Sequence, residues 1–107
     1  MVISLAGEWD IYRRDELRSR LEAAYHEPRV VLDLTAAKFV TSTLIGALIV
    51  ASKHRAEHEM PPAVLAVRSA FVRRLLAATG VEEYLPIYEN VAQAIAHGDG
   101  SMEQHAV

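Results

Sequence analysis

The chain has 107 residues, 51% of them hydrophobic and 23% charged, with a formal net charge of -3 and no cysteine. This length allows one domain with a hydrophobic core and is too short for two ordinary domains. The net negative charge argues against a surface that binds nucleic acid or anionic lipid, and the lack of cysteine excludes disulfides, thiolate-bound zinc and a cysteine nucleophile.

The start of the chain lacks the basic stretch and apolar core of a targeting signal, and the longest apolar run, residues 44–51, is less than half of a membrane span. We therefore expect a cytoplasmic protein without membrane insertion. Arginine pairs occur at Arg13 and Arg14 and at Arg73 and Arg74. Each pair lies near acids in an amphipathic segment, which indicates a solvated helix face rather than a polyanion site.

A short strand is predicted over residues 2–5, which read as β-like and are followed by Gly7. A helix is predicted over residues 14–24, because its apolar residues fall on one face. That face holds Leu17, Leu21 and Ala24. Pro28 prevents the helix from continuing. Residues 30–34 then predict a second strand, apolar at nearly every position as in a central strand covered on both faces.

The next helix is predicted from Ser42 or Thr43 to about His58. Its first half is apolar and is expected to be buried, whereas residues 53–59 are polar and are expected to be exposed. Two prolines at residues 61–62 end this helix.

Residues 63–67 predict a third strand, and Ser69 is expected to cap a helix that stops at Gly80. Residues 84–88 predict the last strand, and Pro86 marks it as an edge strand because proline cannot donate a ladder hydrogen bond.

A final helix is expected to start near Asn90, and residues 98–107 are expected to form a flexible tail. Because strands and helices alternate, the sequence predicts a single α/β domain over residues 1–97. We expect about four strands in a mixed or partly parallel sheet, together with four helices.

Three consecutive hydroxyl residues, Thr41, Ser42 and Thr43, lie where the chain enters the apolar helix. A hydroxyl there can cap the helix by accepting a hydrogen bond from a free N–H of the first turn. It can also be a phosphorylation site, where a phosphate would meet free N–H donors and add nearly two negative charges to the surface. Thr41 is the expected cap, Ser42 the candidate acceptor and Thr43 a helix-start residue.

Gly46 lies inside this predicted helix, where glycine costs about 1 kcal/mol relative to alanine and therefore needs a reason. Close approach of another segment would supply one. That segment is either a neighbouring strand or helix of the same domain or a partner protein, and both readings stay open. Asp33, the polar residue of the second predicted strand, is either a solvated strand end or an acid near Ser42 that shapes the site.

Catalytic and metal-binding patterns are weak in this sequence. His54 and His58 have the i, i+4 spacing of a zinc pair, but no third ligand is evident, so a solvated helix end is the preferred reading. The nucleophile-elbow pattern, a phosphate-binding loop and a dinucleotide fingerprint are all missing from the sequence. We therefore predict a protein that is not an enzyme and needs no metal or cofactor.

Three stretches resemble the STAS domains of bacterial anti-sigma factor antagonists. Residues 5–10, LAGEWD, are similar to the opening L-x-G-E-x-D of that family, residues 31–46 to its switch region, and residues 72–81, VRRLLAATGV, to its third-helix signature. The resemblance runs from about residue 2 to residue 97. The resemblance implies a STAS-like sheet.

In that family the switch usually reads aromatic, any residue, Asp, Ser, Ser or Thr, Gly, Leu, Gly, and the serine after the aspartate is phosphorylated by a kinase that is also the anti-sigma factor. The resemblance makes Ser42 the acceptor in this chain. Thr41 stands at the aspartate position and Leu44 at the first glycine, while Ile45 and Gly46 keep the character of the rest. Thr41 can still cap the helix but supplies no negative charge.

The resemblance implies an anti-sigma factor antagonist that binds an anti-sigma factor with serine kinase activity and is switched by phosphorylation of Ser42. The surface expected to contact this partner comprises Asp33, Thr41, Ser42, Thr43, Leu44, Ile45, Gly46 and Ile49. If exposed, Leu44 would either fill a pocket of the partner or block a partner built for glycine. The alternative is a non-phosphorylated STAS scaffold or a subunit of a lipid-transport or signalling complex, which Leu44 and the missing aspartate favour.

Family members usually begin with a further strand that pairs with the one predicted here over residues 2–5. The given sequence begins after the position of that strand, so we expect a sheet of four strands or a first pairing partner from elsewhere. An exposed edge over these residues is a candidate for self-association, which predicts a homodimer formed through the N-terminal strand.

Overall fold

A computed structural model describes residues 1–96. Within them four short strands form one sheet in the order β1-β2-β3-β4, and every neighbouring pair is parallel. The strands are β1 (Val2–Ser4), β2 (Val31–Asp33), β3 (Val64–Ala66) and β4 (Ile87–Tyr88). The prediction of an α/β fold is therefore confirmed. The predicted tail, residues 98–107, lies outside the described residues.

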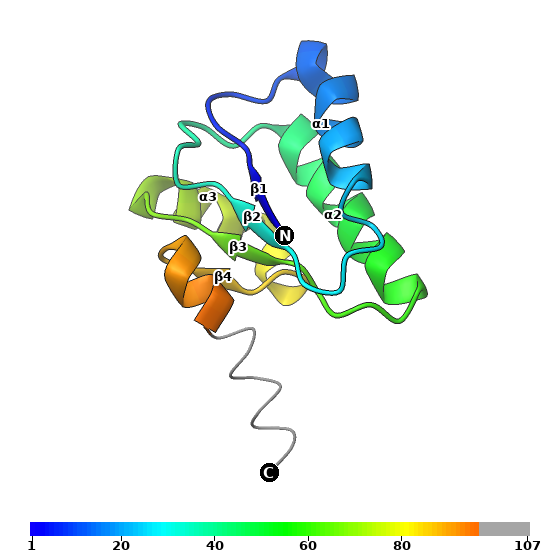
Figure 1. The fold of residues 1–107 in the computed structure, drawn as a ribbon. Coiled ribbons are helices and arrows are strands. Elements are labelled where there is room, and N and C mark those ends of the chain that lie inside the picture. Colours follow the sequence, from blue (N-terminus) through cyan, green and yellow to red (C-terminus); the bar gives the residue numbers. More distant parts are fainter. Residues whose placement is uncertain (97–107) are drawn as a thin grey trace.

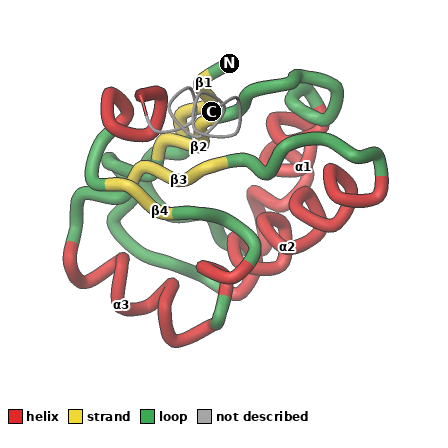
Figure 2. The backbone as a smooth tube through the Cα atoms, turned by 90° about the horizontal axis from the view of Figure 1, so that it is seen from below, coloured by secondary structure: helices red, strands yellow, loops and turns green. Residues whose placement is uncertain are grey.

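The helices connect consecutive strands. They are α1 (Arg14–Glu22), preceded by a single 3-10 turn (Ile11–Arg13), then α2 (Ser42–Glu57) and α3 (Ala70–Thr79), and a last helical segment begins at residue 91. Parallel strands in sequential order require right-handed crossovers, which place all three connecting helices on the same face of the sheet. Figures 1 and 2 show α1, α2 and α3 together on that face. None of the helices in residues 1–96 is long and apolar enough to cross a membrane.

Residues 91–96 cover the opposite face of the sheet. Alternate residues of each strand point to opposite faces, so Leu32 of β2 belongs to the large core under α1, α2 and α3, whereas Val31 packs with Ala66 and Ala94 on the other side. The prediction that this strand is covered on both faces is confirmed.

The two caps of α3 and the proline before β4 lie where the sequence predicts them. The Ser69 hydroxyl accepts a hydrogen bond from the Val72 N–H at 3.2 Å, and Gly80 ends α3 with a positive φ of 76°. Pro86 precedes β4, which lies at one edge of the sheet. The other edge is β1, whose outer side has no strand partner in residues 1–96. Homodimer formation through β1 stays a prediction.

The second half of α2 differs from the prediction that it is exposed throughout. Arg55 is only 2% exposed, and its guanidinium donates hydrogen bonds to the carbonyl oxygens of Ala24, Glu27, Pro28 and Pro61 at 2.8–3.2 Å. Burial lowers the pKa of Arg55. The helical period places Arg55 on the face of Leu48 and Ala51, where two loops present carbonyl groups that need donors. Arg55 thus joins the end of α1 to the segment after α2.

Candidate partner-binding site at the start of the second helix

Thr41 is the N-cap of α2. Its backbone is extended, and its hydroxyl oxygen accepts a hydrogen bond from the Leu44 N–H at 3.1 Å. The predicted capping role is therefore confirmed. The same hydroxyl donates a hydrogen bond to the backbone carbonyl of Trp9, in the loop after β1. A threonine can fill both roles at once, whereas an ionised aspartate could only accept.

Ser42 is the first residue of α2 and is exposed. Its hydroxyl makes no hydrogen bond to any residue in the described part of the chain, and Thr43 beside it is half-buried. The Ser42 oxygen is therefore accessible from solvent without breaking a contact within residues 1–96. A phosphate attached there would lie close to the N–H groups of the first helical turn.

Leu44 faces the core rather than a partner. Its side chain is fully buried, at 0% exposure, and belongs to the large hydrophobic cluster. The expected role of Leu44 as a partner contact is therefore wrong in this conformation, because the helix begins with Leu44 turned toward the sheet. Ile45 and Ile49 are half-buried and pack against the same core, which leaves only part of each accessible.

Gly46 is exposed, and a Cβ atom built on it would meet no atom within 4 Å. A neighbouring strand or helix in residues 1–96 therefore does not explain the glycine, and a role in contacting a partner protein stays a prediction. Gly46 lies in a groove of about 410 Å³ between α1 and α2. The α1 side of this α1–α2 groove comprises Ile11, Arg14, Arg18, Leu21 and Tyr25, and the α2 side Ser42, Thr43, Gly46, Ala47 and Val50.

Asp33 organises the turn after β2. One carboxylate oxygen accepts hydrogen bonds from the backbone N–H of Thr35 at 2.9 Å and from its hydroxyl at 2.6 Å. Asp33 is half-buried at this strand end and does not line the α1–α2 groove. Neither sequence reading included this turn-forming role, which depends on Thr35 two residues later.

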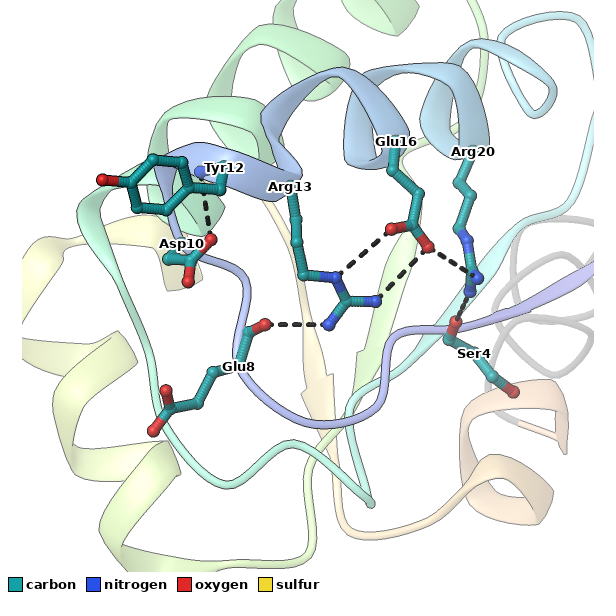
Figure 3. A network of polar contacts seen from close by, with 7 residues as sticks. All are labelled: Ser4, Glu8, Asp10, Tyr12, Arg13, Glu16 and Arg20. Atoms are coloured by element: carbon teal, nitrogen blue, oxygen red, sulfur yellow. Dashed lines mark hydrogen bonds and ion pairs between the residues drawn. The ribbon is translucent and has the colours of Figure 1, made fainter.

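Trp9 links the site to the core. Its side chain is fully buried, and the Arg13 guanidinium lies over the indole ring at 3.7 Å from the ring centroid. Figure 3 shows Glu16 between Arg13 and Arg20, with ion pairs at 3.3 and 3.0 Å. The hydrogen bond from Arg13, aided by the positive charges of Arg13 and Arg20, holds the pKa of Glu16 below its usual value. Arg13 is thus partly exposed, and its guanidinium also has a structural role through Glu16 and Trp9.

The backbone is tied into the same network. The Arg13 guanidinium donates to the Glu8 carbonyl at 2.8 Å, and Arg20 donates to the Ser4 carbonyl at 3.0 Å (Figure 3). These bonds fasten the end of β1 and the following loop to α1. Because Thr41 donates to the Trp9 carbonyl in that loop, the start of α2 is held against an ordered surface.

His54 of α2 and His58, the C-cap of that helix, belong to a stack of rings. The His54 ring stacks on Tyr25 at 4.1 Å and on His58 at 4.2 Å between centroids. Residues 1–96 contain no group of three His, Cys, Asp or Glu side chains that could hold a metal ion. Burial raises the pKa of Tyr25. The stack contributes to the contact between α1 and α2.

Comparison with known proteins gives one family. The STAS domain model matches residues 1–94. A comparison with curated protein sequences gives no significant match.

Three similar solved structures are informative. An anti-sigma factor antagonist from Mycobacterium paratuberculosis is 23% identical, with a TM-score of 0.75 over 90% of this chain and 82% of that one. A putative anti-sigma factor antagonist from Thermotoga maritima is 18% identical, with a TM-score of 0.73 over 90% and 86%. The anti-sigma factor antagonist SpoIIAA in its unphosphorylated form is 16% identical, with a TM-score of 0.69 over 92% and 88%. At these identities the likeness establishes the fold.

Proposed function

Because the chain belongs to the STAS domain family, we propose that it is an anti-sigma factor antagonist, a regulatory protein that binds an anti-sigma factor in the cytoplasm and so releases a sigma factor. The structural relatives that are described as anti-sigma factor antagonists support this function. The observation that carries it is an exposed serine with an unengaged hydroxyl at the start of α2, next to an exposed glycine in an open groove.

The partner contacts the surface formed by Thr41, Ser42, Thr43 and Gly46, with the accessible parts of Ile45 and Ile49. Leu44 and Asp33 support this surface from behind, the first by packing into the core and the second by forming the turn after β2. The glycine lets a partner side chain or backbone approach the helix closely.

The partner is an anti-sigma factor with serine kinase activity, and it phosphorylates Ser42. The phosphate adds nearly two negative charges and considerable bulk to the surface that the partner must cover, so the complex weakens. No large change of fold is needed, because the effect is local. Thr41 supplies no charge to orient the serine, so the kinase must do so with its own groups or its metal-bound nucleotide.

Phosphoryl transfer tests the modification directly. The purified protein is incubated with a kinase-type anti-sigma factor from the same genome and ATP, and its intact mass is measured. We expect the mass of one added phosphoryl group, lost in Ser42→Ala and retained in Ser19→Ala. Ser19 is the matched control because it is an exposed helical serine outside the α1–α2 groove.

Binding tests the consequence. Ser42→Asp should weaken the complex at least about tenfold, equivalent to about 1.4 kcal/mol, whereas Ser19→Asp should leave the affinity unchanged. Absence of phosphoryl transfer together with equal affinities of the wild type and Ser42→Asp would contradict the switch.

One observation favours a second candidate, a non-phosphorylated STAS scaffold or subunit of a lipid-transport or signalling complex. The Thr41 hydroxyl donates an uncharged hydrogen bond that joins α2 to the Trp9 loop. This bond keeps the contact surface ordered, as a constant scaffold requires. In that case Gly46→Leu would abolish assembly with the partner while Ser42→Asp would have no effect. The neighbouring gene provides a quick discriminator, since an ATPase resembling a histidine kinase points to the first function and a transporter to the second.

A further inference from the structure

Two arginines of the α1–α2 groove have no role in the function proposed so far. Arg14 is exposed and makes no ion pair or hydrogen bond with any residue of the described range 1–96. Arg18 has one long ion pair, 4.0 Å to Asp15, and both side chains are mostly exposed. Such a pair contributes little to stability. Both guanidinium groups are therefore available to an anion in the groove.

Arg14 and Ser42 are the first residues of α1 and α2, and both line the α1–α2 groove. Both α1 and α2 follow parallel strands and return over the same face, so they run in the same direction (Figure 1). Tyr25, in the turn after α1, stacks on His54 of α2 at 4.1 Å. All three residues, Arg14, Ser42 and Thr43, line the same groove.

The other arginines of this region are already engaged. Arg13 and Arg20 bind Glu16 (Figure 3). Both lie over the Trp9 ring, and neither lines the groove. The arginines therefore divide into a pair that holds the fold and a pair, Arg14 and Arg18, that lines the groove. The first turn of α2 contains no acidic residue that would compete with an anion for Arg14 and Arg18. The acid that Arg18 contacts is Asp15 of α1.

We propose that Arg14, assisted by Arg18, forms an intramolecular binding site for the phosphoryl group of phospho-Ser42. This site rests on the proposed phosphorylation of Ser42 and deepens it. A guanidinium group matches two phosphate oxygens with two parallel N–H donors, and a groove of about 410 Å³ has ample room for the phosphate. The phosphate and the arginine side chains thereby occupy the α1–α2 groove. The partner can then bind neither in the space beside Gly46 nor to the two guanidinium groups.

The experiment installs phosphoserine at position 42 during translation, so no kinase is required. The second ionisation of the phosphate, ordinarily near pH 6, is followed by ³¹P NMR during a pH titration. In the Arg14→Gln variant the midpoint of this titration should rise by about one pH unit, because the substitution removes a cation beside the phosphate dianion. Arg14→Lys should keep most of the shift, since it retains the charge. Arg74→Gln, at an exposed arginine of α3, is the control and should have the same titration midpoint as the phosphorylated protein without substitutions.

Equal midpoints in Arg14→Gln, the Arg14→Gln/Arg18→Gln double variant and Arg74→Gln would overturn the proposal. Circular dichroism checks that each variant is folded, which is expected because Arg14 and Arg18 are exposed. The two hypotheses fail separately. A lack of phosphoryl transfer by the anti-sigma factor would contradict the natural switch but not a shifted midpoint, whereas an unshifted midpoint would contradict the arginine site even where transfer occurs.

Discussion

Replacing Gly46 by alanine should make the protein more stable. The residue lies inside α2 with space for a Cβ atom, since nothing comes within 4 Å of that position. Alanine is favoured over glycine in a helix interior by about 0.8–1.0 kcal/mol, because glycine loses more conformational freedom on folding. With no clash to offset this gain, we expect Gly46→Ala to raise the free energy of unfolding by about 1 kcal/mol and Tm by about 4–8 °C.

Urea unfolding followed by tryptophan fluorescence measures this gain. Trp9 is the one tryptophan of the chain, and its full burial makes its emission sensitive to unfolding. The midpoint should rise at an unchanged slope, which indicates a change in stability rather than in the surface exposed on unfolding. Ala56→Gly, at an exposed position of the same helix, should have the opposite sign.

The stabilised variant should also bind its partner less well. Gly46 destabilises the helix, and no packing contact within residues 1–96 explains it. We therefore expect the partner to occupy the space beside Gly46, so Gly46→Ala should lower the affinity while Ala56→Gly should not. A Gly46→Ala protein that is less stable than the wild type would refute the structural reasoning. Unchanged affinity in a stabilised variant would refute the claim that the glycine serves a partner.

Three further changes test the supports of the site. Thr41→Val removes both the helix cap and the donor to the Trp9 carbonyl, so stability in urea should fall by about 1–2 kcal/mol, whereas Thr41→Ser should keep most of it. Arg55→Met leaves buried carbonyl groups without donors and should cost about 3 kcal/mol, and a neutral result would show that water replaces the guanidinium. Glu16→Gln should be less stable than the wild type at neutral pH. Because Arg13 lowers the pKa of that carboxyl in the folded state, the difference should vanish as the pH falls through the lowered pKa; a difference that persists in acid would contradict this origin.

Local signals in the sequence were sufficient for most of the fold. Alternating strand and helix patterns predict an α/β fold with a mixed or partly parallel sheet, whereas all strand pairs in the structure are parallel. Single residues such as Ser69, Gly80 and Pro86 mark helix ends and an edge strand because their backbone chemistry allows few alternatives. The same applies to Thr41, whose capping role depends only on the three residues that follow it.

Features that depend on partners distant in sequence could not be predicted in this way. Arg55 stands in a polar run, and only the folded chain brings carbonyl groups from residues 24–28 and 61 around it. The inward direction of Leu44 depends on where α2 begins and how it rotates against the sheet. Likewise, Arg13 and Arg14 are adjacent in sequence but lie on opposite sides of a helix start, one over Trp9 and the other in the α1–α2 groove.

Thr41 stands where the resemblance to the family places an aspartate, and this difference changes what holds the start of α2. An aspartate at position 41 would strengthen the cap through its charge but would place a carboxylate against the Trp9 carbonyl, where the Thr41 hydroxyl donates a hydrogen bond. The start of α2 is therefore ordered by its bond to the Trp9 loop, which Arg13, Glu16 and Arg20 in turn fasten to α1. A partner meets a surface that is already in place, and binding avoids the entropic cost of ordering it. With threonine at position 41, no carboxylate in the first turn of α2 competes for the Arg14 guanidinium with the phosphate that we propose on Ser42.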